Sequence, residues 1–393
     1  MKSVDDAAKR FPVVTLTGPR QSGKTTLART TFPAKTYVSL EAPDTREAAT
    51  TDPRRFLAGF PQGAILDEVQ RAPDLLSYLQ VLVDEEPDAR GRWILTGSQN
   101  FALLARVSQS LAGRTALFTL LPFDLGEWKR IGAATARLDE TLFAGFFPRI
   151  HDAGLAPREW LVTYVATYLE RDVRQILNVT DLTSFQTFLR LCAGRSGQLL
   201  NVASLASDAG ISHATAKSWL SVLEASYVLF RLPPWFRNVN KRLIRTPKLY
   251  FHDTGLLCFL LGIQDAGQVA THPLRGAIFE TFAVGEILKQ RVHRGQLPDL
   301  YFYRDRRGVE VDLLVDLGPT LLAVECKAGM TVHGDLLRGL GVFASLCTDR
   351  RPEVTRLESF LVYAGDDTSI RQEVHITAWR DLDRVPWVPD PDK

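Results

Sequence analysis

The chain has few cysteines and no long apolar run. Only four of its 393 residues are cysteines, and no two of them are spaced as a Cys-x-x-Cys pair. This spacing argues against a zinc site and a disulfide scaffold, and it fits a reducing cytoplasm. No stretch reaches the roughly 18 apolar residues that a membrane span needs, and residues 1–6 contain no apolar signal region. We therefore expect a cytoplasmic protein with no membrane partner.

The chain also has little net charge. Its 47 lysines and arginines nearly balance 45 aspartates and glutamates, which leaves +2. Any nucleic-acid surface must therefore be local. The hydrophobic content of 45% is ordinary for a soluble globular protein, and the length allows two or three domains. The patterns predict domains at 1–150, 151–260 and 261–384, and the proline-rich tail at 385–393 is expected to be frayed.

A glycine-rich loop with a lysine lies between a predicted strand at residues 13–17 and a helix that begins near Thr26. It matches the pattern G-x-x-x-x-G-K-[ST] and supplies these candidate ATP-binding residues: Gly18, Pro19, Arg20, Gln21, Ser22, Gly23, Lys24, Thr25 and Thr26. Backbone N–H groups of such a loop surround phosphates, and the helix N-terminus adds positive potential. Lys24 is expected to reach the β- and γ-phosphates, and the Thr25 hydroxyl to bind Mg²⁺. The flanking strand and helix disfavour the alternative, a glycine turn without function.

Two further predicted strands end in polar side chains. Residues 64–66 lead into Asp67, placed to hold Mg²⁺ through water, and Glu68, placed to polarise the attacking water. Residues 93–96 lead into the hydroxyls of Thr96 and Ser98, either of which could orient that water or sense the γ-phosphate. An ordinary strand-end turn is the alternative for these two hydroxyls. Arg114 follows as a candidate arginine finger for the ATP of a neighbouring subunit.

Strand and helix patterns alternate through this region, with strands predicted at 13–17, 36–40, 64–66, 93–96 and 116–120. Such alternation predicts an α/β fold with a parallel sheet, and ligands bind at the carboxyl ends of its strands. The order of phosphate loop, acidic pair, hydroxyls and arginine resembles AAA-type ATPases. That resemblance implies a homo-oligomer, with a hexameric ring as one form, because the arginine finger acts in trans.

The middle of the chain predicts helices and a basic loop. Residues 159–179 have the spacing of a long amphipathic helix. Residues 205–215 have the pattern of a helix-turn-helix, in which Ala206 allows close approach, Gly210 makes the turn and Ser212 caps the second helix. Residues 229–251 predict two strands around a loop, the wing of a winged helix. The candidate DNA-contacting residues are Lys217 on the second helix and Arg237, Lys241, Arg242 and Arg245 in the loop, whose flanks add Arg231 and Lys248. Structural packing is the alternative role of this region.

The last region places acidic residues in apolar elements. Glu280 lies in a predicted helix around 277–284, and strands are predicted at 300–304, 309–315 and 321–327. If the last two strands form a hairpin at Gly318-Pro319, Asp312 faces Glu325 and Lys327 shares a face with Glu325. Opposed carboxylates need a cation between them, and Mg²⁺ or Mn²⁺ would serve, with Glu280 completing the ligands. The alternative is an exposed hairpin with a same-face salt pair.

This pattern of Glu280, Asp312 and Glu325-Cys326-Lys327 resembles the restriction-endonuclease-like PD-(D/E)xK nucleases. The resemblance implies that the three carboxylates bind metal and that Lys327 helps to activate water or steady the phosphate. The order of motifs along nearly the whole chain resembles a bacterial and archaeal family of AAA-type ATPases that carry such a C-terminal domain. The ten residues before Phe11 are a shorter lead-in than this family usually has, which is read either as a truncated start or as a shortened docking helix.

The leading functional hypothesis is an oligomeric ATPase that acts on DNA by remodelling, translocation or processing, through contacts that select DNA structure rather than sequence. Its C-terminal site would bind the DNA or cut it. The alternative is a nucleotide-gated binding or regulatory protein whose nuclease fold is catalytically retired. Sequence-specific transcriptional regulation is the least favoured hypothesis, since the second helix of the helix-turn-helix pattern is only weakly basic.

Overall fold

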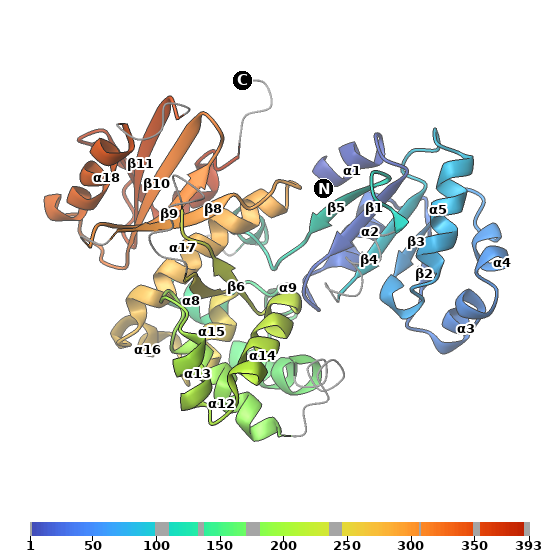
Figure 1. Cartoon of the computed structure of the whole chain (residues 1–393), viewed down its shortest axis with the longest axis horizontal. Helices are drawn as coiled ribbons and strands as arrows, with labels where there is room; N and C mark the ends of the chain where they lie inside the picture. The colour runs from blue at the N-terminus through green and yellow to red at the C-terminus, as the bar shows by residue number, and fades with distance from the viewer. Residues whose placement is uncertain are drawn as a thin grey trace. The chain divides into compact units, whose positions relative to one another are not determined.

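The computed structural model describes residues 2–98, 110–132, 137–169, 181–235, 246–305, 308–348 and 354–388. The chain divides into two compact units, which we describe separately (Figure 1). Unit 1 comprises residues 1–122 with the short segments 225–227 and 292–296, and unit 2 comprises the rest. Among the helices of the described residues, none is long and apolar enough to cross a membrane.

Unit 1 is built on a five-stranded sheet in which every pair is parallel. Its spatial order is β2-β3-β4-β1-β5, with bounds β1 (Val13–Thr17), β2 (Thr36–Ser39), β3 (Ala64–Asp67), β4 (Trp93–Gly97) and β5 (Thr115–Thr119). The five predicted strands are confirmed to within one residue at each end. The parallel arrangement brings the carboxyl ends of β1, β3 and β4 to one edge of the sheet.

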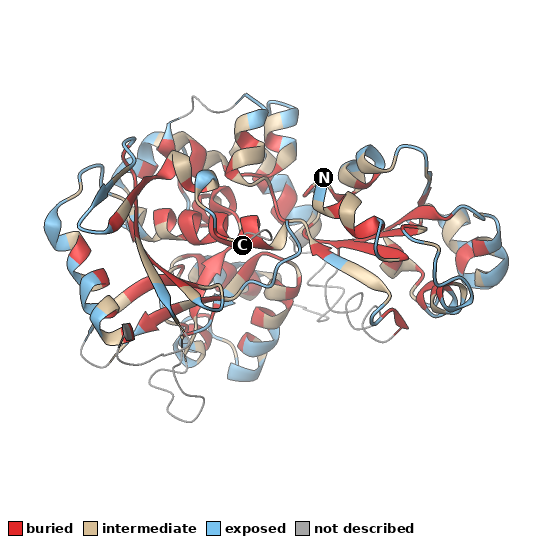
Figure 2. Ribbon diagram, turned by 90° about the horizontal axis from the view of Figure 1, so that it is seen from above, coloured by how far each residue is buried: buried red, intermediate tan, exposed pale blue. Residues whose placement is uncertain are grey.

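Helices cover both faces of this sheet (Figures 1 and 2). Side chains alternate along a strand, so Val13 of β1 packs with α5 (Leu75–Glu85), whereas Val14 packs with Ala7 and Ala28. The last two belong to α1 (Lys2–Ala8) and α2 (Lys24–Thr31). Burial on both faces explains why β1, β3 and β4, which are buried along their whole length, have apolar residues at consecutive positions. The remaining elements of unit 1 are α3 (Pro43–Thr51), α4 (Pro53–Ala58) and η1 (Val69–Arg71).

Unit 2 begins with helices and a small sheet. Their bounds are α7 (Leu125–Arg130), α8 (Leu138–Ala144), α9 (Pro148–Asp152), α10 (Pro157–Tyr164), η3 (Val165–Leu169), α12 (Leu182–Ala193), α13 (Val202–Asp208), α14 (His213–Ala225), β6 (Leu229–Leu232), β7 (Lys248–Phe251), α15 (Thr254–Leu260) and α16 (Ala266–Thr271). The helix predicted at 159–179 is α-helical only to Tyr164 and continues as a π-helical turn, and its residues from 170 lie outside the described part.

The predicted helix pair is present as α13 and α14. Gly210 between them has a φ of 67°, which favours glycine, and the Ser212 hydroxyl accepts a hydrogen bond from the Thr215 N–H at 3.0 Å. The two predicted strands are β6 and β7, which pair antiparallel. The loop between them, residues 236–245, lies outside the described part of the chain.

The end of unit 2 is a six-stranded mixed sheet in the order β12-β13-β11-β10-β9-β8. The elements are α17 (Arg275–Val292), β8 (Leu300–Arg304), β9 (Glu310–Asp316), β10 (Thr320–Lys327), η4 (Gly334–Leu337), α18 (Arg338–Thr348), β11 (Arg356–Tyr363), β12 (Ser369–Arg371), β13 (Val374–Ala378) and η5 (Trp379–Arg384). Leu340 and Phe343 of α18 pack against the sheet. The three predicted strands are confirmed to within one residue, and β9 and β10 form the predicted hairpin, with Gly318 in its turn at φ 83°.

The tail that was expected to be frayed from residue 385 packs onto unit 2 instead, at least as far as Trp387. The Trp387 side chain is fully buried, and its indole N–H donates to the Leu382 carbonyl at 2.7 Å. The expectation was wrong here because a large aromatic ring, once its N–H is paired, stabilises the fold strongly by burial. Residues 389–393 lie outside the described part.

Candidate functional site

The loop between β1 and α2 is shaped to wrap around an anion. Gly18 has a φ of 144°, and a Cβ atom there would lie 2.0 Å from the Leu120 carbonyl oxygen, so only glycine fits. Gln21 and Gly23 also have positive φ values, of 63° and 93°, and α2 begins directly at Lys24. These turns place the loop immediately before a helix N-terminus, where backbone N–H groups have no partner within the helix.

Lys24 is a buried ammonium group whose hydrogen bonds go to backbone carbonyls. Its Nζ donates to the carbonyl oxygens of Gly18 at 3.1 Å and Pro19 at 2.6 Å, and the residue is only 6% exposed. Burial lowers the pKa of Lys24 to about 8, although Glu68 and Asp67 oppose the shift. The buried Ser22 hydroxyl has no hydrogen-bond partner among the described residues. A bound polyphosphate would neutralise the Lys24 charge and give the Ser22 hydroxyl a hydrogen-bond partner.

The Asp67 carboxylate gathers three hydroxyl groups at the carboxyl ends of β3 and β4. It accepts hydrogen bonds from Thr25 at 3.0 and 3.2 Å, from Tyr37 at 2.7 Å and from Thr96. The predicted grouping of Thr25, Asp67 and Thr96 is therefore present. Tyr37 was missed, because nothing in the sequence marks an edge-strand tyrosine as a partner of this acid. A set of hydroxyl and carboxylate oxygens fits Mg²⁺, which prefers such ligands.

Glu68 lies beside Asp67 in a left-handed backbone conformation, with φ 57° and ψ 46°. This conformation turns its carboxylate toward β4, where Oε2 accepts hydrogen bonds from Ser98 at 3.0 Å and from the Gln70 amide. Ser98 thus holds Glu68 as Thr96 holds Asp67, so the two predicted hydroxyls each position one of the two acids. Gln70 is a second residue missed by sequence reasoning.

A cavity of about 500 Å³ adjoins this site between α2 and the edge strand β2. Thr25, Thr26 and Tyr37 lie in its wall, and the guanidinium of Arg29 stands over the Tyr37 ring, 5.0 Å from its centroid. The predicted residues Thr26 and Gln21 are exposed, and Arg20 is half-buried.

Arg114 does not lie at the nucleotide site of its own chain. Its carbonyl oxygen accepts a hydrogen bond from the N–H of Val13, the first residue of β1, so it marks the opposite edge of the sheet. Its guanidinium forms a two-pronged ion pair with Asp84, at 2.6 and 2.8 Å. Any role as an arginine finger must therefore be played in trans, and that role stays a prediction.

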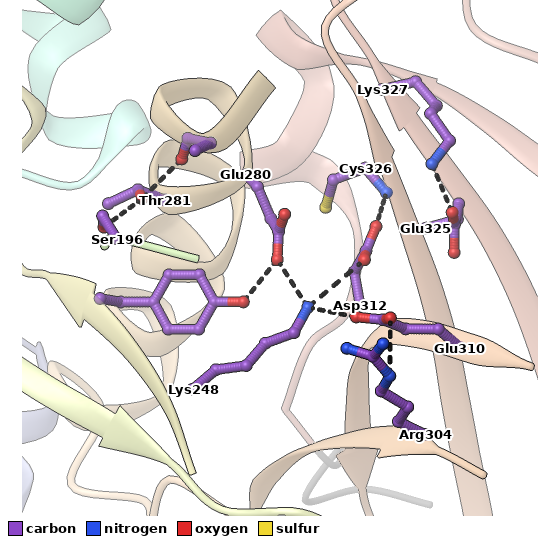
Figure 3. Close-up of polar contacts among 12 residues, drawn as sticks. Ser196, Lys248, Glu280, Thr281, Arg304, Glu310, Asp312, Glu325, Cys326 and Lys327 are labelled. Atoms are coloured by element: carbon purple, nitrogen blue, oxygen red, sulfur yellow. Dashed lines mark hydrogen bonds and ion pairs between the residues drawn. The ribbon is translucent and has the colours of Figure 1, made fainter. Parts of the chain in front are cut away.

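The predicted acidic cluster of unit 2 is built around a lysine (Figure 3). The Lys248 ammonium group lies 3.0 Å from Glu280 Oε1, 2.8 Å from Glu310 Oε1 and 3.7 Å from Asp312 Oδ1. Tyr250, also from β7, donates its hydroxyl hydrogen to Glu280 at 2.5 Å. The interpretation of Lys248 as part of a basic DNA-facing surface is wrong, because the residue is 3% exposed and surrounded by carboxylates.

Glu325 and Lys327 form their own pair beside this cluster. The ladder between β9 and β10 pairs Leu313 with Val324, so the predicted opposition of Asp312 and Glu325 continues its register. Asp312 turns toward the backbone, where its Oδ2 accepts the Cys326 N–H at 2.9 Å. Burial, followed by repulsion from Asp312, raises the pKa values of Glu280 and Glu325 to about 7.

The residues of this cluster do not fit the divalent ion that was predicted for them. An ammonium group lies among Glu280, Glu310 and Asp312, at the position where a cation would have to bind. Among the described residues, the side chains close enough to share one ion do not include Glu280, Asp312 and Glu325 as a set. No catalytic step through a metal ion at this site follows from the geometry.

The predicted DNA-contacting residues are largely outside the described part. Arg237, Lys241, Arg242 and Arg245 all fall in residues 236–245. Lys217 is exposed on α14. Arg231 on β6 is paired with Glu224 of α14, since its Nε and Nη2 groups each donate to one carboxylate oxygen. Among the predicted DNA-contacting residues, Lys217 is therefore the one whose position the structure describes.

The parallel sheet, the phosphate loop and the Asp67-Glu68 site define a P-loop ATPase domain of the AAA type. Residues 10–129 match the family described as an AAA domain, residues 135–267 a domain of unknown function (DUF8612), and residues 275–382 a second one (DUF4143). The chain is 35% identical over 326 residues to the uncharacterized protein Rv2008c of Mycobacterium tuberculosis, an alignment that covers 83% of this chain and 72% of that protein. Protein Mb2031c of Mycobacterium bovis gives the same values. The chain belongs to the family of these two mycobacterial proteins.

Solved structures resemble the chain more distantly. The Walker-type ATPase paby2304 of Pyrococcus abyssi is 16% identical with a TM-score of 0.45, covering 66% of this chain and 93% of that one. A point variant of RuvB from Thermotoga maritima is 19% identical with a TM-score of 0.31, covering 59% of this chain and 87% of that one.

Proposed function

We propose that the protein is a Mg²⁺-dependent ATPase that works as a homo-oligomer, a hexameric ring being one form, and acts on DNA. The observation that carries the ATPase part is the presence, in one site, of a buried ammonium group in a phosphate loop and of two acids at the end of β3. ATP hydrolysis and nucleotide binding are also what an AAA domain implies. Action on DNA is the finer part of the proposal.

The residues of unit 1 divide the work of phosphoryl transfer. Lys24 and the N–H groups of the loop hold the phosphates, and Thr25 with Asp67 would hold Mg²⁺, which neutralises charge on the transferred phosphoryl group when bound. Glu68 orients and polarises the attacking water, and Ser98 and Gln70 fix its carboxylate. Thr96 fixes Asp67 in the same way. Arg114 of a neighbouring subunit would supply positive charge in trans.

Two features of unit 2 support DNA as the substrate. The helices α13 and α14, followed by β6 and β7, have the order of a winged helix, with Lys217 exposed on the second helix and four basic residues in the loop between the strands. Glu280 of α17, followed along the chain by Asp312 of β9 and by Glu325 and Lys327 of β10, has the order of residues that resembles PD-(D/E)xK nucleases. We propose that these surfaces hold DNA by its backbone and select structure rather than sequence.

The test uses end-labelled duplex, forked and single-stranded DNA with Mg²⁺ or Mn²⁺. It measures DNA binding and cleavage with and without ATP, and ATP turnover with and without each DNA. Lys24→Ala and Lys327→Ala run beside the unaltered protein. The proposal expects that at least one DNA form stimulates ATP turnover, and that Lys24→Ala abolishes the turnover. ATP turnover that no DNA form changes, together with no DNA binding at low salt, contradicts action on DNA and leaves the ATPase intact.

A second candidate is a nucleotide-gated binding or regulatory protein, in which unit 2 is an interaction module. The observation that favours it is the lysine among the carboxylates of the nuclease-like site. This candidate expects no DNA cleavage under any of these conditions and no effect of Lys327→Ala. It also expects that Lys24→Ala abolishes formation of a complex that ATP otherwise promotes, as size-exclusion chromatography with light scattering would show.

A further inference from the structure

We propose that Lys248 is the resident cation of the carboxylate cluster in unit 2, and that its ammonium group excludes a divalent ion from the cluster. The inference rests on the geometry of unit 2 and stands whether or not the protein acts on DNA. Lys248 thus neutralises the carboxylates for which the sequence analysis predicted a metal ion.

The first support is the distribution of charge. The cluster contains four carboxylates, those of Glu280, Glu310, Asp312 and Glu325. Lys248 contacts the first three, Arg304 adds a contact to Glu310 at 3.6 Å, and Lys327 pairs with Glu325. Every carboxylate therefore has a cationic partner from the chain itself. These partners balance most of the negative charge, so the cluster attracts an outside cation only weakly.

The second support is space. A Mg²⁺ ion binds carboxylate oxygens at about 2.0–2.1 Å and demands near-octahedral surroundings. The oxygens of Glu280 and Glu310 instead converge on the Lys248 nitrogen, at 3.0 and 2.8 Å. An ion that used these oxygens together would have to take the place of the ammonium group. Lys248 also stands near the face of Phe302, with Nζ 5.6 Å from the ring centroid.

The third support is that the backbone of Lys248 is held on both edges of β7. It pairs with Leu232 of β6 on one edge and forms a bridge with Leu199 on the other. The flanking residues extend this second edge, since the Leu200 N–H donates to the Pro247 carbonyl at 2.8 Å and the Leu249 N–H to that of Gln198 at 3.0 Å. A lysine held in this way cannot leave the cluster by a shift of a surface loop.

The experiment measures Mn²⁺ binding to the full chain by isothermal titration calorimetry, without nucleotide. All proteins carry Asp67→Asn, which removes the candidate metal ligand of unit 1. In this background, adding Asp312→Asn should change nothing, because the cluster binds no Mn²⁺. Adding Lys248→Met should create one Mn²⁺ site, at least about tenfold tighter than any site in the background protein. Asp312→Asn should then abolish the new site.

The matched control is Lys327→Met, which removes the other lysine of the region but leaves Lys248 in place, and it should create no site. The proposal is overturned if the background protein binds one Mn²⁺ that Asp312→Asn removes. It is equally overturned if the Lys248→Met protein folds and gains no Mn²⁺ site. If that variant does not fold, the comparison of the background protein with its Asp312→Asn derivative still decides the question.

Discussion

Two lysines of this chain lie beside carboxylates near strand ends, but their surroundings shift the lysine pKa in opposite directions. Lys24 in unit 1 donates to two carbonyl oxygens, and burial lowers its pKa to about 8. Lys248 in unit 2 is also buried, but three carboxylates surround it and raise its pKa above the usual value despite that burial. The Lys24 charge therefore has no carboxylate bonded to it among the described residues and is available to a ligand, whereas carboxylates of the chain already neutralise the Lys248 charge.

A lysine near acids is therefore not by itself evidence of a ligand site. What distinguishes the two is whether the chain supplies the counter-charge. At Lys24 the nearby acids are engaged by the hydroxyls of Thr25, Thr96 and Ser98, so the ammonium group remains available to phosphate. At Lys248 the acids contact the ammonium group directly.

Lys24→Ala should lower the rate of ATP hydrolysis by about a thousandfold or more, because it removes the positive charge that stabilises the phosphates in the transition state. Steady-state phosphate release at saturating Mg²⁺ measures the effect. Lys9→Ala, at an exposed site directly after α1, is the matched control and should retain full activity. Substantial hydrolysis by Lys24→Ala would mean that the charge of Lys24 is not reserved for ATP.

Lys248→Met should destabilise unit 2 by about 3–5 kcal/mol, because the loss of one partner leaves buried carboxylates without a counter-charge. Urea unfolding followed by hydrogen exchange in unit 2 measures the change. Lys327→Met is the control, and it should cost less than about 1 kcal/mol, since Lys327 is about one-third exposed and its ion pair within the described part of the chain is with Glu325. Equal losses in the two variants would contradict the distinction drawn between these lysines.

The strands, helices and turns of both sites could be predicted from the sequence, whereas most of the side-chain contacts within the sites could not. Local signals suffice for the phosphate loop, for the acids after β3 and for the hairpin at Gly318, because each is written in a few neighbouring residues. The need for a cation between Asp312 and the other carboxylates was also predictable from charge repulsion alone. The identity of that cation was not, because Lys248 reaches the cluster from a strand far away in the sequence.

A signal for Lys248 was nevertheless present. It directly precedes the apolar residues Leu249, Tyr250 and Phe251 of a buried strand, and lysine is almost never fully buried unless it is paired. The basic residues of the preceding loop obscured this signal, because Lys248 continues their pattern along the sequence. Tyr37 gave no such signal, since an edge-strand tyrosine is common and its hydroxyl partner, Asp67, depends on how β2 pairs with β3.

ATP affinity should fall as the pH rises above 8, by about tenfold per pH unit. In the protein without nucleotide, Lys24 loses its proton near pH 8, whereas bound phosphate favours the charged form and raises its pKa. Binding above pH 8 must therefore take up a proton, so a higher pH weakens it. Calorimetric titration with ATP between pH 7 and pH 10 measures the slope. Lys24→Met should bind weakly at every pH, and a flat profile for the unaltered protein would show that Lys24 stays charged without a ligand.

Tyr37→Phe should raise the Mg²⁺ concentration needed for half-maximal ATP hydrolysis by about fivefold, the equivalent of about 1 kcal/mol for one hydrogen bond to the Asp67 carboxylate. The phenylalanine keeps the ring under Arg29 and removes only the hydroxyl that donates to Asp67 at 2.7 Å. Tyr78→Phe, on the partly exposed surface of α5, is the control and should leave the Mg²⁺ dependence unchanged. If Tyr37→Phe instead lowers the Mg²⁺ requirement, the hydroxyl competes with the ion for Asp67. The carboxylate of unit 1 would then be neutralised by its own chain, as those around Lys248 are.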